Sequence, residues 1–339
     1  MRRLTCVAAV VLTAVGLGAQ SGRFPERLPL DQLDVSPPAT RVTGDLGSLR
    51  AHRVACPSQD LTGAALRRRI VDVTVQEWSF FGHAVLDYTR PDVFDRARIR
   101  RRGWSLLDRE ETVRVADSIA GYWTVTPEGS WIIENQNRRW HQFGVASRWR
   151  TPWSAAFISW VMCESGLDER EQFRRAVAHH TYIDQAIRAR DGAAASAAFT
   201  AYDIGEAPIA PGDLLCSGRR PVYRSVAERR HQMGEGARMH CDIVVKLEPD
   251  RFRILAIGGN VRATVGLKLL PAEVDAQVGV LPAGGPRPMF VHLKLAADPI
   301  APDALDDTPT LRALSCAGRA WPESLRVASI APPDPAAHC

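Results

Sequence analysis

The hydrophobic pattern of this 339-residue chain changes its period once, and that change limits the folds the chain can adopt. Up to about residue 190, apolar residues recur every three or four positions, which is typical of helices that bury one face. After the turn signal Pro211-Gly212, short apolar runs alternate with turns, which is typical of β-strands. We therefore expect an α+β fold, with N-terminal helices followed by an antiparallel β-sheet. Strands are predicted at 213–216, 240–246, 252–257, 265–270 and 289–295.

Four helices are predicted before the strands. The first covers about 66–85, and the second begins at Asp108 with the pattern of a capping box. The third begins with Thr151 as its cap and Pro152 at its first position, where the missing N–H of proline costs nothing. The fourth runs from about 168 to 190. Residue 154 then falls in the first turn of the third helix.

The connections between these elements carry the polar and aromatic residues expected around a cleft. The stretch 124–150 is polar and rich in tryptophan and is predicted to be a loop flanking the cleft. A second loop is predicted over the arginine-rich stretch 217–239. Pro-Asp at 249–250 and Gly-Gly at 258–259 suit short turns between neighbouring antiparallel strands.

The N-terminus has the pattern of a secretory signal peptide over residues 1–20. Arg2 and Arg3 precede an apolar run from 4 to 17, which ends in small residues. This run is shorter than the ~20 apolar residues of a spanning helix, so an uncleaved anchor is the weaker alternative. We expect an exported protein of the periplasm or cell envelope, with no transmembrane segment in the mature chain.

Three parts are expected after the leader. Residues 21–58 are rich in proline and predict an extended N-terminal arm, and 59–295 predict the α+β domain. Residues 296–339, rich in Pro, Asp and Ala, predict a loosely packed C-terminal tail. Loss of Arg2 and Arg3 with the leader lowers the formal net charge from +5 to about +3. Because basic and acidic residues are intermixed, no nucleic-acid partner is expected.

Seven cysteines occur, and Cys6 lies in the leader. The even number that remains indicates disulfides in an exported chain, with buried free thiols as the alternative. Cys216 with Cys241 is the favoured pair, because each lies at the end of a strand in one sheet. No cysteine pair has the spacing of a zinc site, and no metal or cofactor is expected. The six are Cys56, Cys163, Cys216, Cys241, Cys316 and Cys339.

Three residues in the middle of the chain form a candidate catalytic set. Ser154 lies at a helix start, where the helix dipole and free N–H groups stabilise an oxyanion. His240 on a strand can accept its proton, and Asn260 can orient the imidazole. Each also has a plain structural explanation: a first-turn serine, a core histidine and a left-handed turn residue. Cys163 and Cys241 are predicted to point away, so neither replaces Ser154 as nucleophile.

Four sequence runs carry a family resemblance: Pro-Trp-Ser-Ala-Ala-Phe-Ile-Ser-Trp-Val at 152–161, Pro-Gly-Asp-Leu-Leu-Cys at 211–216, His-Cys-Asp-Ile-Val at 240–244 and Gly-Gly-Asn-Val at 258–261. Over about residues 65–275 the chain resembles an uncharacterised bacterial family, domain of unknown function 2272 (DUF2272). The resemblance implies a relation to papain-like cell-wall hydrolases, including the CHAP amidases. In those enzymes cysteine, histidine and a polar third residue stand at the positions of Ser154, His240 and Asn260. The chain therefore departs from the pattern by having serine where the catalytic cysteine is expected.

The resemblance implies an amidase or endopeptidase that acts on peptidoglycan, with Ser154 attacking, His240 as base and Asn260 as orienter. A catalytically inactive module that binds peptidoglycan or an envelope protein through the same cleft is the main alternative, and a structural envelope protein is another. Trp149, Trp153 and His180 are candidate substrate contacts, although each also suits a core position. His179 is expected to face solvent. A glycosidase would need carboxylates such as Glu134, Asp203 and Glu206, which no spacing ties together.

Overall fold

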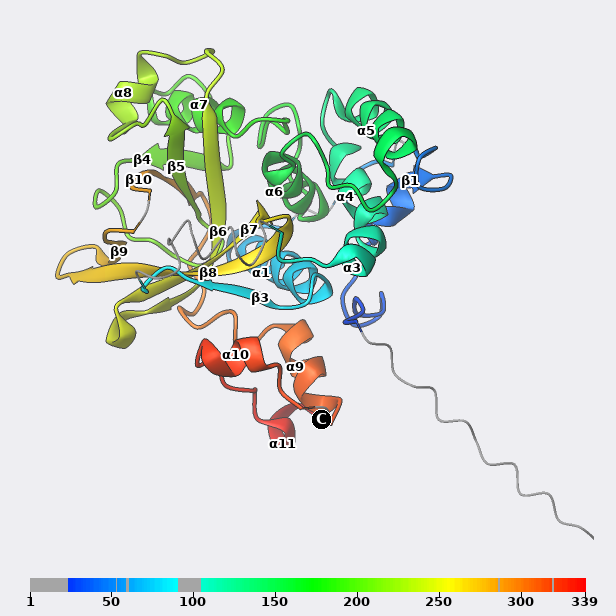
Figure 1. Cartoon of the computed structure of the whole chain (residues 1–339). Helices are drawn as coiled ribbons and strands as arrows, with labels where there is room; N and C mark the ends of the chain where they lie inside the picture. The colour runs from blue at the N-terminus through cyan, green and yellow to red at the C-terminus, as the bar shows by residue number, and fades with distance from the viewer. Residues whose placement is uncertain (1–23, 53, 59–60, 91–104, 286, 319) are drawn as a thin grey trace, which may run out of the picture.

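The computed structural model describes residues 24–52, 54–58, 61–90, 105–285, 287–318 and 320–339. Over these residues the chain is a mixed α/β protein in which helices pack against one large sheet (Figure 1). The predicted leader at 1–20 lies outside the described residues. Where the structure describes the chain, no helix combines the length and the apolar composition needed to cross a bilayer.

The large sheet has the strand order β3-β8-β7-β6-β5-β10-β4, and β9 pairs with β8. Its pairs are antiparallel, as expected, except that β3 runs parallel to β8. The five strands predicted from sequence are present as β5, β6, β7, β8 and β10. The bounds are β3 Ala84–Asp87, β4 Phe199–Tyr202, β5 Leu214–Arg220, β6 Arg238–Glu248, β7 Arg253–Val261, β8 Thr264–Asp275, β9 Gly279–Pro282 and β10 Met289–Leu295.

The helices differ from the prediction in three places. The first ends at Phe80, because Gly82 and His83 have left-handed φ values of 92° and 56°, and the chain then enters β3. The predicted loop 124–150 contains the long helix α5, and the predicted fourth helix is helical only from His180. The bounds are α1 Gly63–Phe80, α3 Arg109–Arg114, α4 Ala116–Trp123, α5 Gly129–Phe143, α6 Ser154–Glu164, α7 His180–Arg190, α8 Val226–Arg230, α9 Pro309–Cys316, α10 Glu323–Val327 and α11 Pro335–His338.

Two local predictions were close. The capping box at Asp108 is present, since its carboxylate accepts the N–H of Glu111 and the Glu111 carboxylate accepts the N–H of Asp108. The third predicted helix, α6, begins at Ser154 with Trp153 as its N-cap, rather than at Thr151. Ser154 is thus the first helical residue.

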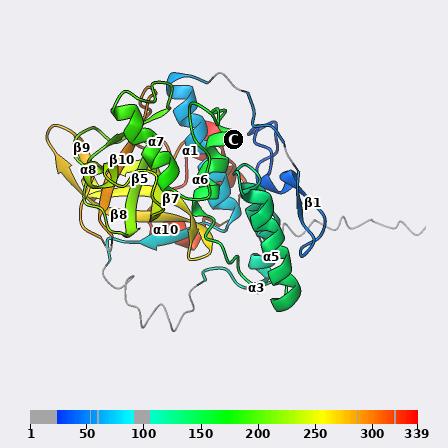
Figure 2. The same cartoon turned by 90° about the horizontal axis from the view of Figure 1, so that it is seen from above.

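Helix α6 is the central element of the fold. It lies between the large sheet and α4, and it packs on β6 and β7 (Figure 1). Farther from the sheet, α5 packs on β2 (Arg50–Ala51), whose partner strand β1 (Val42–Thr43) contacts α4; both views show β1 on the same side of the molecule as α5 (Figures 1 and 2). Trp78, Trp123, Trp153 and Trp160 are fully buried in this region. The position and direction of α6 are therefore fixed from two sides.

The N-terminal arm is anchored in the core by buried contacts. Arg41, in the short 3-10 helix η1 (Pro38–Arg41), pairs with Glu164 at 2.6 Å, and both side chains are buried. A disulfide also joins Cys56 to Cys163. Glu164 and Cys163 are both in the last turn of α6. The arm therefore restrains the helix that carries Ser154.

The C-terminal tail is packed, and the expectation of a loose segment was wrong. Leu305, Leu311 and Leu325 are fully buried, because α9 packs on α1 and α10 packs near β3. A disulfide between Cys316 and Cys339 closes its last three helices.

The predicted disulfide between Cys216 and Cys241 is present. The two cysteines are directly opposite each other in the antiparallel pair β5–β6. With the two disulfides described above, it pairs all six cysteines of the described residues. Cys163 and Cys241 are therefore not available as nucleophiles.

Candidate active site

The N-terminus of α6 presents Ser154 next to unpaired backbone N–H groups. The first N–H groups of a helix lack acceptors within it, and no side chain caps this end. The helix approaches β7 closely because Gly259 has no side chain. A Cβ at residue 259 would lie 2.5 Å from Cβ of Phe157 in α6. The Gly-Gly pair predicted to be a turn is therefore inside a strand, and the turn comes later, at Arg262 and Ala263, which have positive φ.

Ser154 forms a hydrogen bond with a histidine that sequence reasoning placed in solvent. Its Oγ lies 2.7 Å from Nε2 of His179, and Nδ1 of the same ring is hydrogen-bonded to the hydroxyl of Tyr182. His179 is only 4% exposed. The prediction placed His179 inside a helix that began near residue 168. In the structure α7 begins at His180, so His179 is its N-cap residue and its side chain is buried. The result is a continuous Ser154-His179-Tyr182 chain of hydrogen bonds.

A second histidine lies beside this chain. Nε2 of His240 is 3.0 Å from Oδ1 of Asp242, and Oδ2 of Asp242 is 2.7 Å from Nζ of Lys268. His240 and Asp242 share a face of β6 because they are two residues apart on a strand. The rings of His179 and His240 are 5.4 Å apart between centroids. The two histidines therefore belong to one site.

The structure brings His240 together with Asp242, not with Asn260 as the prediction expected. In the described structure Nδ1 of His240 is buried and has no hydrogen-bond partner. Asn260 has φ 54° next to the β7–β8 turn, in keeping with the alternative of a left-handed residue. Sequence reasoning missed Asp242 and Lys268. The His-x-Asp spacing on a strand was the signal that could have revealed Asp242.

Burial keeps both histidines neutral at pH 7. It lowers the pKa of His240 to about 4; the nearby charge of Lys268 adds to this effect, and Asp242 opposes it. Burial also lowers the pKa of His179 well below its usual value, with His240 adding to the effect. Burial alone would raise the pKa of Asp242, but Lys268 and His240 hold it below its usual value. The site thus contains two neutral imidazoles beside one buried ion pair.

A pocket of about 630 Å³ opens next to this cluster. His240, Asn260, Trp149 and Trp153 line it. Ser154 is 8% exposed and is not among its described lining residues, although it directly follows Trp153. Two of the three predicted substrate contacts thus lie at the pocket. The pocket also borders the histidine that the sequence singled out.

The third predicted contact, His180, is not among the described residues of this pocket. Its Nδ1 accepts a hydrogen bond from the backbone N–H of Ala237 at 3.4 Å. Two of the three carboxylates considered for a glycosidase are engaged elsewhere: Glu206 pairs with Arg190 at 2.7 Å, and Asp203 accepts the N–H of Val226.

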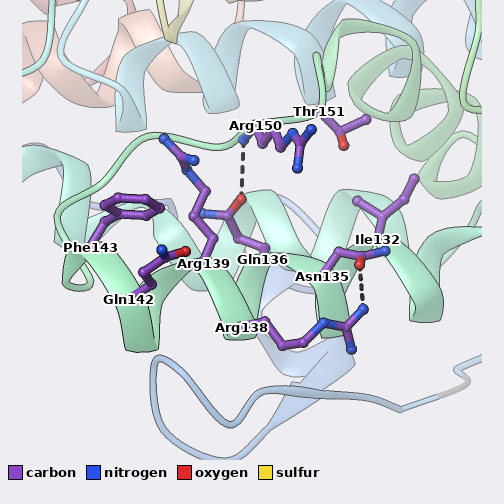
Figure 3. A pocket seen from close by; sticks show the side chains of 9 residues that line it. All are labelled: Ile132, Asn135, Gln136, Arg138, Arg139, Gln142, Phe143, Arg150 and Thr151. Atoms are coloured by element: carbon purple, nitrogen blue, oxygen red, sulfur yellow. Dashed lines mark hydrogen bonds between the residues drawn. The ribbon is translucent and has the colours of Figure 1, made fainter.

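A second pocket of about 400 Å³ lies along α5 (Figure 3). Gln136 accepts the backbone N–H of Arg150 there, which holds the 148–153 segment against α5. Arg139 and Arg150 line both pockets, so the two adjoin. Among the described residues, no group of three His, Cys, Asp or Glu side chains could hold a metal ion.

Comparison with known proteins identifies the family. Neither the curated proteins nor the solved structures contain a match to this chain. One protein family, described as "Uncharacterized protein conserved in bacteria (DUF2272)", matches residues 110–285, which is more than half of the chain. The matched region contains the whole cluster around Ser154. The chain is therefore a member of the DUF2272 family.

Proposed function

We propose that this protein is an exported hydrolase of the papain-like cell-wall type, which cleaves an amide bond in peptidoglycan with Ser154 as nucleophile. The observation that carries the proposal is the 2.7 Å contact between Oγ of Ser154 and Nε2 of His179 at the start of α6. A hydroxyl at this distance from a neutral imidazole can lose its proton during attack. The three disulfides are compatible with an oxidising compartment such as the periplasm.

In this proposal His179 acts as base and then as acid. Its Nδ1–H donates to Tyr182, which leaves the lone pair of Nε2 facing Ser154. The serine oxygen attacks the amide carbon, and its proton passes to Nε2. The free N–H groups of α6 stabilise the oxyanion. His179 gives the proton to the departing amine, and an acyl-serine remains. Water then attacks the ester, its proton passes through His179 back to Oγ, and the acid product leaves.

His240 has a different part in this scheme from the one its sequence position first indicated. Nε2–H of His240 donates to Asp242, so that its unpartnered Nδ1 is a buried acceptor at the pocket. An amide N–H of the substrate is a suitable donor for it, since an unpaired buried acceptor is costly. We assign His240 to substrate positioning, and Asn260 to the wall of the same pocket.

The second candidate function is a binding module without catalysis. It is favoured by one observation: Ser154 is nearly buried and is not a described lining residue, whereas the adjacent pocket is open. Such a module would bind peptidoglycan or an envelope protein through the same pocket.

Mass spectrometry of purified peptidoglycan after incubation with the mature protein tests the proposal. Wild type should release amide-cleavage products, and Ser154→Ala and His179→Ala should not. His231→Ala is the matched control, because His231 is exposed and outside both pockets. Products from Ser154→Cys alone would mean that the site is intact but has lost its nucleophile. No cleavage products from wild type or any variant, with all of them folded, would support the binding module.

A further inference from the structure

The pocket beside His240 has charge of one sign. Seven of its fifteen described lining residues are arginine or lysine, and none of these fifteen is aspartate or glutamate. Among them, Lys268 forms an ion pair with Asp242. The basic residues are Arg139, Arg148, Arg150, Arg219, Arg262, Arg287 and Lys268. A low-dielectric cleft lined by one sign of charge concentrates ligands of the opposite sign.

Two arginines that line this pocket, Arg219 and Arg287, act on each other electrostatically. Arg219 is the second-last residue of β5, and Arg287 lies just before β10. Because β5 and β10 are antiparallel neighbours, both arginines lie at the same end of this strand pair. Both are exposed, and neither pairs with a described carboxylate. Although Arg219 is exposed as a whole, partial desolvation at the pocket lowers its pKa, and the positive charge of Arg287 lowers it further. An anion bound between the two guanidinium groups would offset this repulsion.

The basic lining of the pocket continues toward α5. Arg139 and Arg150 line both this pocket and the adjoining one along α5 (Figure 3). The guanidinium of Arg139 stacks on the ring of Phe143, 4.8 Å from its centroid. Trp149 and Trp153 add aromatic surface to the pocket beside His240. The combined space suits a ligand longer than one residue, with anionic groups on either side of an apolar part.

We infer that this pocket selects peptides that carry several free carboxylates, and that Arg219 and Arg287 are the residues that recognise them. The inference takes the peptide nature of the ligand from the proposed function. Arginine suits this role because its planar fork binds a carboxylate through two hydrogen bonds. In peptidoglycan such ligands are stem peptides whose acidic residues are not amidated.

The shape of the site favours a short acidic peptide over a nucleic acid. Nonspecific nucleic-acid binding uses an extended basic surface that follows the phosphate backbone. Here the arginines converge on a pocket of about 630 Å³, within the range of small-ligand sites. Outside it, several basic residues are paired with acids, as in Arg190 with Glu206 and Arg230 with Asp191.

Calorimetric titration of the full mature chain carrying Ser154→Ala tests the inference without turnover. The ligands are a peptidoglycan stem tetrapeptide with all carboxylates free and the same peptide fully amidated. The free-acid peptide should bind at least tenfold more tightly, and the difference should shrink at high salt. Arg219→Gln and Arg287→Gln should each remove about tenfold, or about 1.4 kcal/mol. Arg224→Gln, an exposed arginine of the same 217–239 stretch outside both pockets, should change nothing.

Equal affinity for the two peptides, or no binding of either, would overturn the inference, and so would tighter binding of a DNA oligonucleotide than of the free-acid peptide. The outcomes separate it from the proposed function. Hydrolysis of amidated peptidoglycan by wild type, with no preference for carboxylates, would leave the hydrolase standing and remove the inference. Arginine-dependent binding of the acidic peptide without any hydrolysis would support the inference about the pocket and remove the hydrolase.

Discussion

Replacing Gly258 by alanine should break the hydrogen bond between His240 and Asp242. A Cβ at residue 258 would lie 2.0 Å from Oδ1 of Asp242 and 3.0 Å from Nε2 of His240. Because carbon and oxygen approach to about 3.3 Å, the carboxylate must move by about 1.3 Å. A 3.0 Å hydrogen bond does not survive that displacement. The φ of Gly258 is outside the left-handed region, so alanine adds no backbone strain.

The cost follows from the burial of these groups. Losing a hydrogen bond to a charged group costs about 1.5–3 kcal/mol, and disturbing the buried pair of Asp242 with Lys268 adds to it. We expect Gly258→Ala to lower the free energy of unfolding by about 2–4 kcal/mol in urea at pH 7. Gly236→Ala is the matched control, since nothing lies within 4 Å of its added Cβ, and it should change stability by less than about 0.5 kcal/mol. A Gly258→Ala protein as stable as this control would refute the described packing of the site.

Three further predictions concern pH, the arm and the proposed base. Burial raises the pKa of Asp72 to about 7, above about 3.9 in the unfolded chain, so stability should fall as pH rises from 4 to 7. Asp72→Asn should therefore gain at most about 4 kcal/mol in urea unfolding at pH 8 and nothing at pH 4; an equal gain at both would contradict this. Alanine at both Cys56 and Cys163 removes a link of 107 residues and should cost about 5 kcal/mol in the same assay; a loss below 1 kcal/mol would show that the arm does not depend on it. Tyr182→Phe should lower kcat of peptidoglycan cleavage about 10–100-fold with KM unchanged, because His179 loses its orienting partner; unchanged kcat would exclude that role.

The strands, the Cys216–Cys241 disulfide and the capping box at Asp108 followed from sequence, because each is decided by residues close together in the chain or paired across one turn of the meander. Helix α5 was missed because it has only a narrow apolar stripe. Its many polar residues made the composition of this segment similar to that of a loop. In the structure Ile132, Ile133 and Trp140 supply the buried face.

The candidate site was predicted only in part. The position of Ser154 followed from the local helix signal, but its partner did not. His179 reaches Ser154 because the chain turns between α6 and α7, which no local pattern records. Gly258 and Gly259 seemed a turn because glycine is permissive, whereas here they leave room for Asp242 and for Phe157. Both glycines are needed because side chains from other elements occupy the space where a Cβ would be. Such contacts depend on tertiary packing and cannot be read from the local sequence.

The most direct test of the central claim is intact-protein mass spectrometry after treatment with an alkyl fluorophosphonate, which reacts with activated serine hydroxyls. The account predicts one adduct per wild-type chain, mapped to Ser154 by peptide sequencing, and its loss in His179→Ala but not in His231→Ala. An unmodified Ser154 in the folded wild-type protein, or equal labelling of the His179→Ala variant, would contradict the claim that His179 activates Ser154.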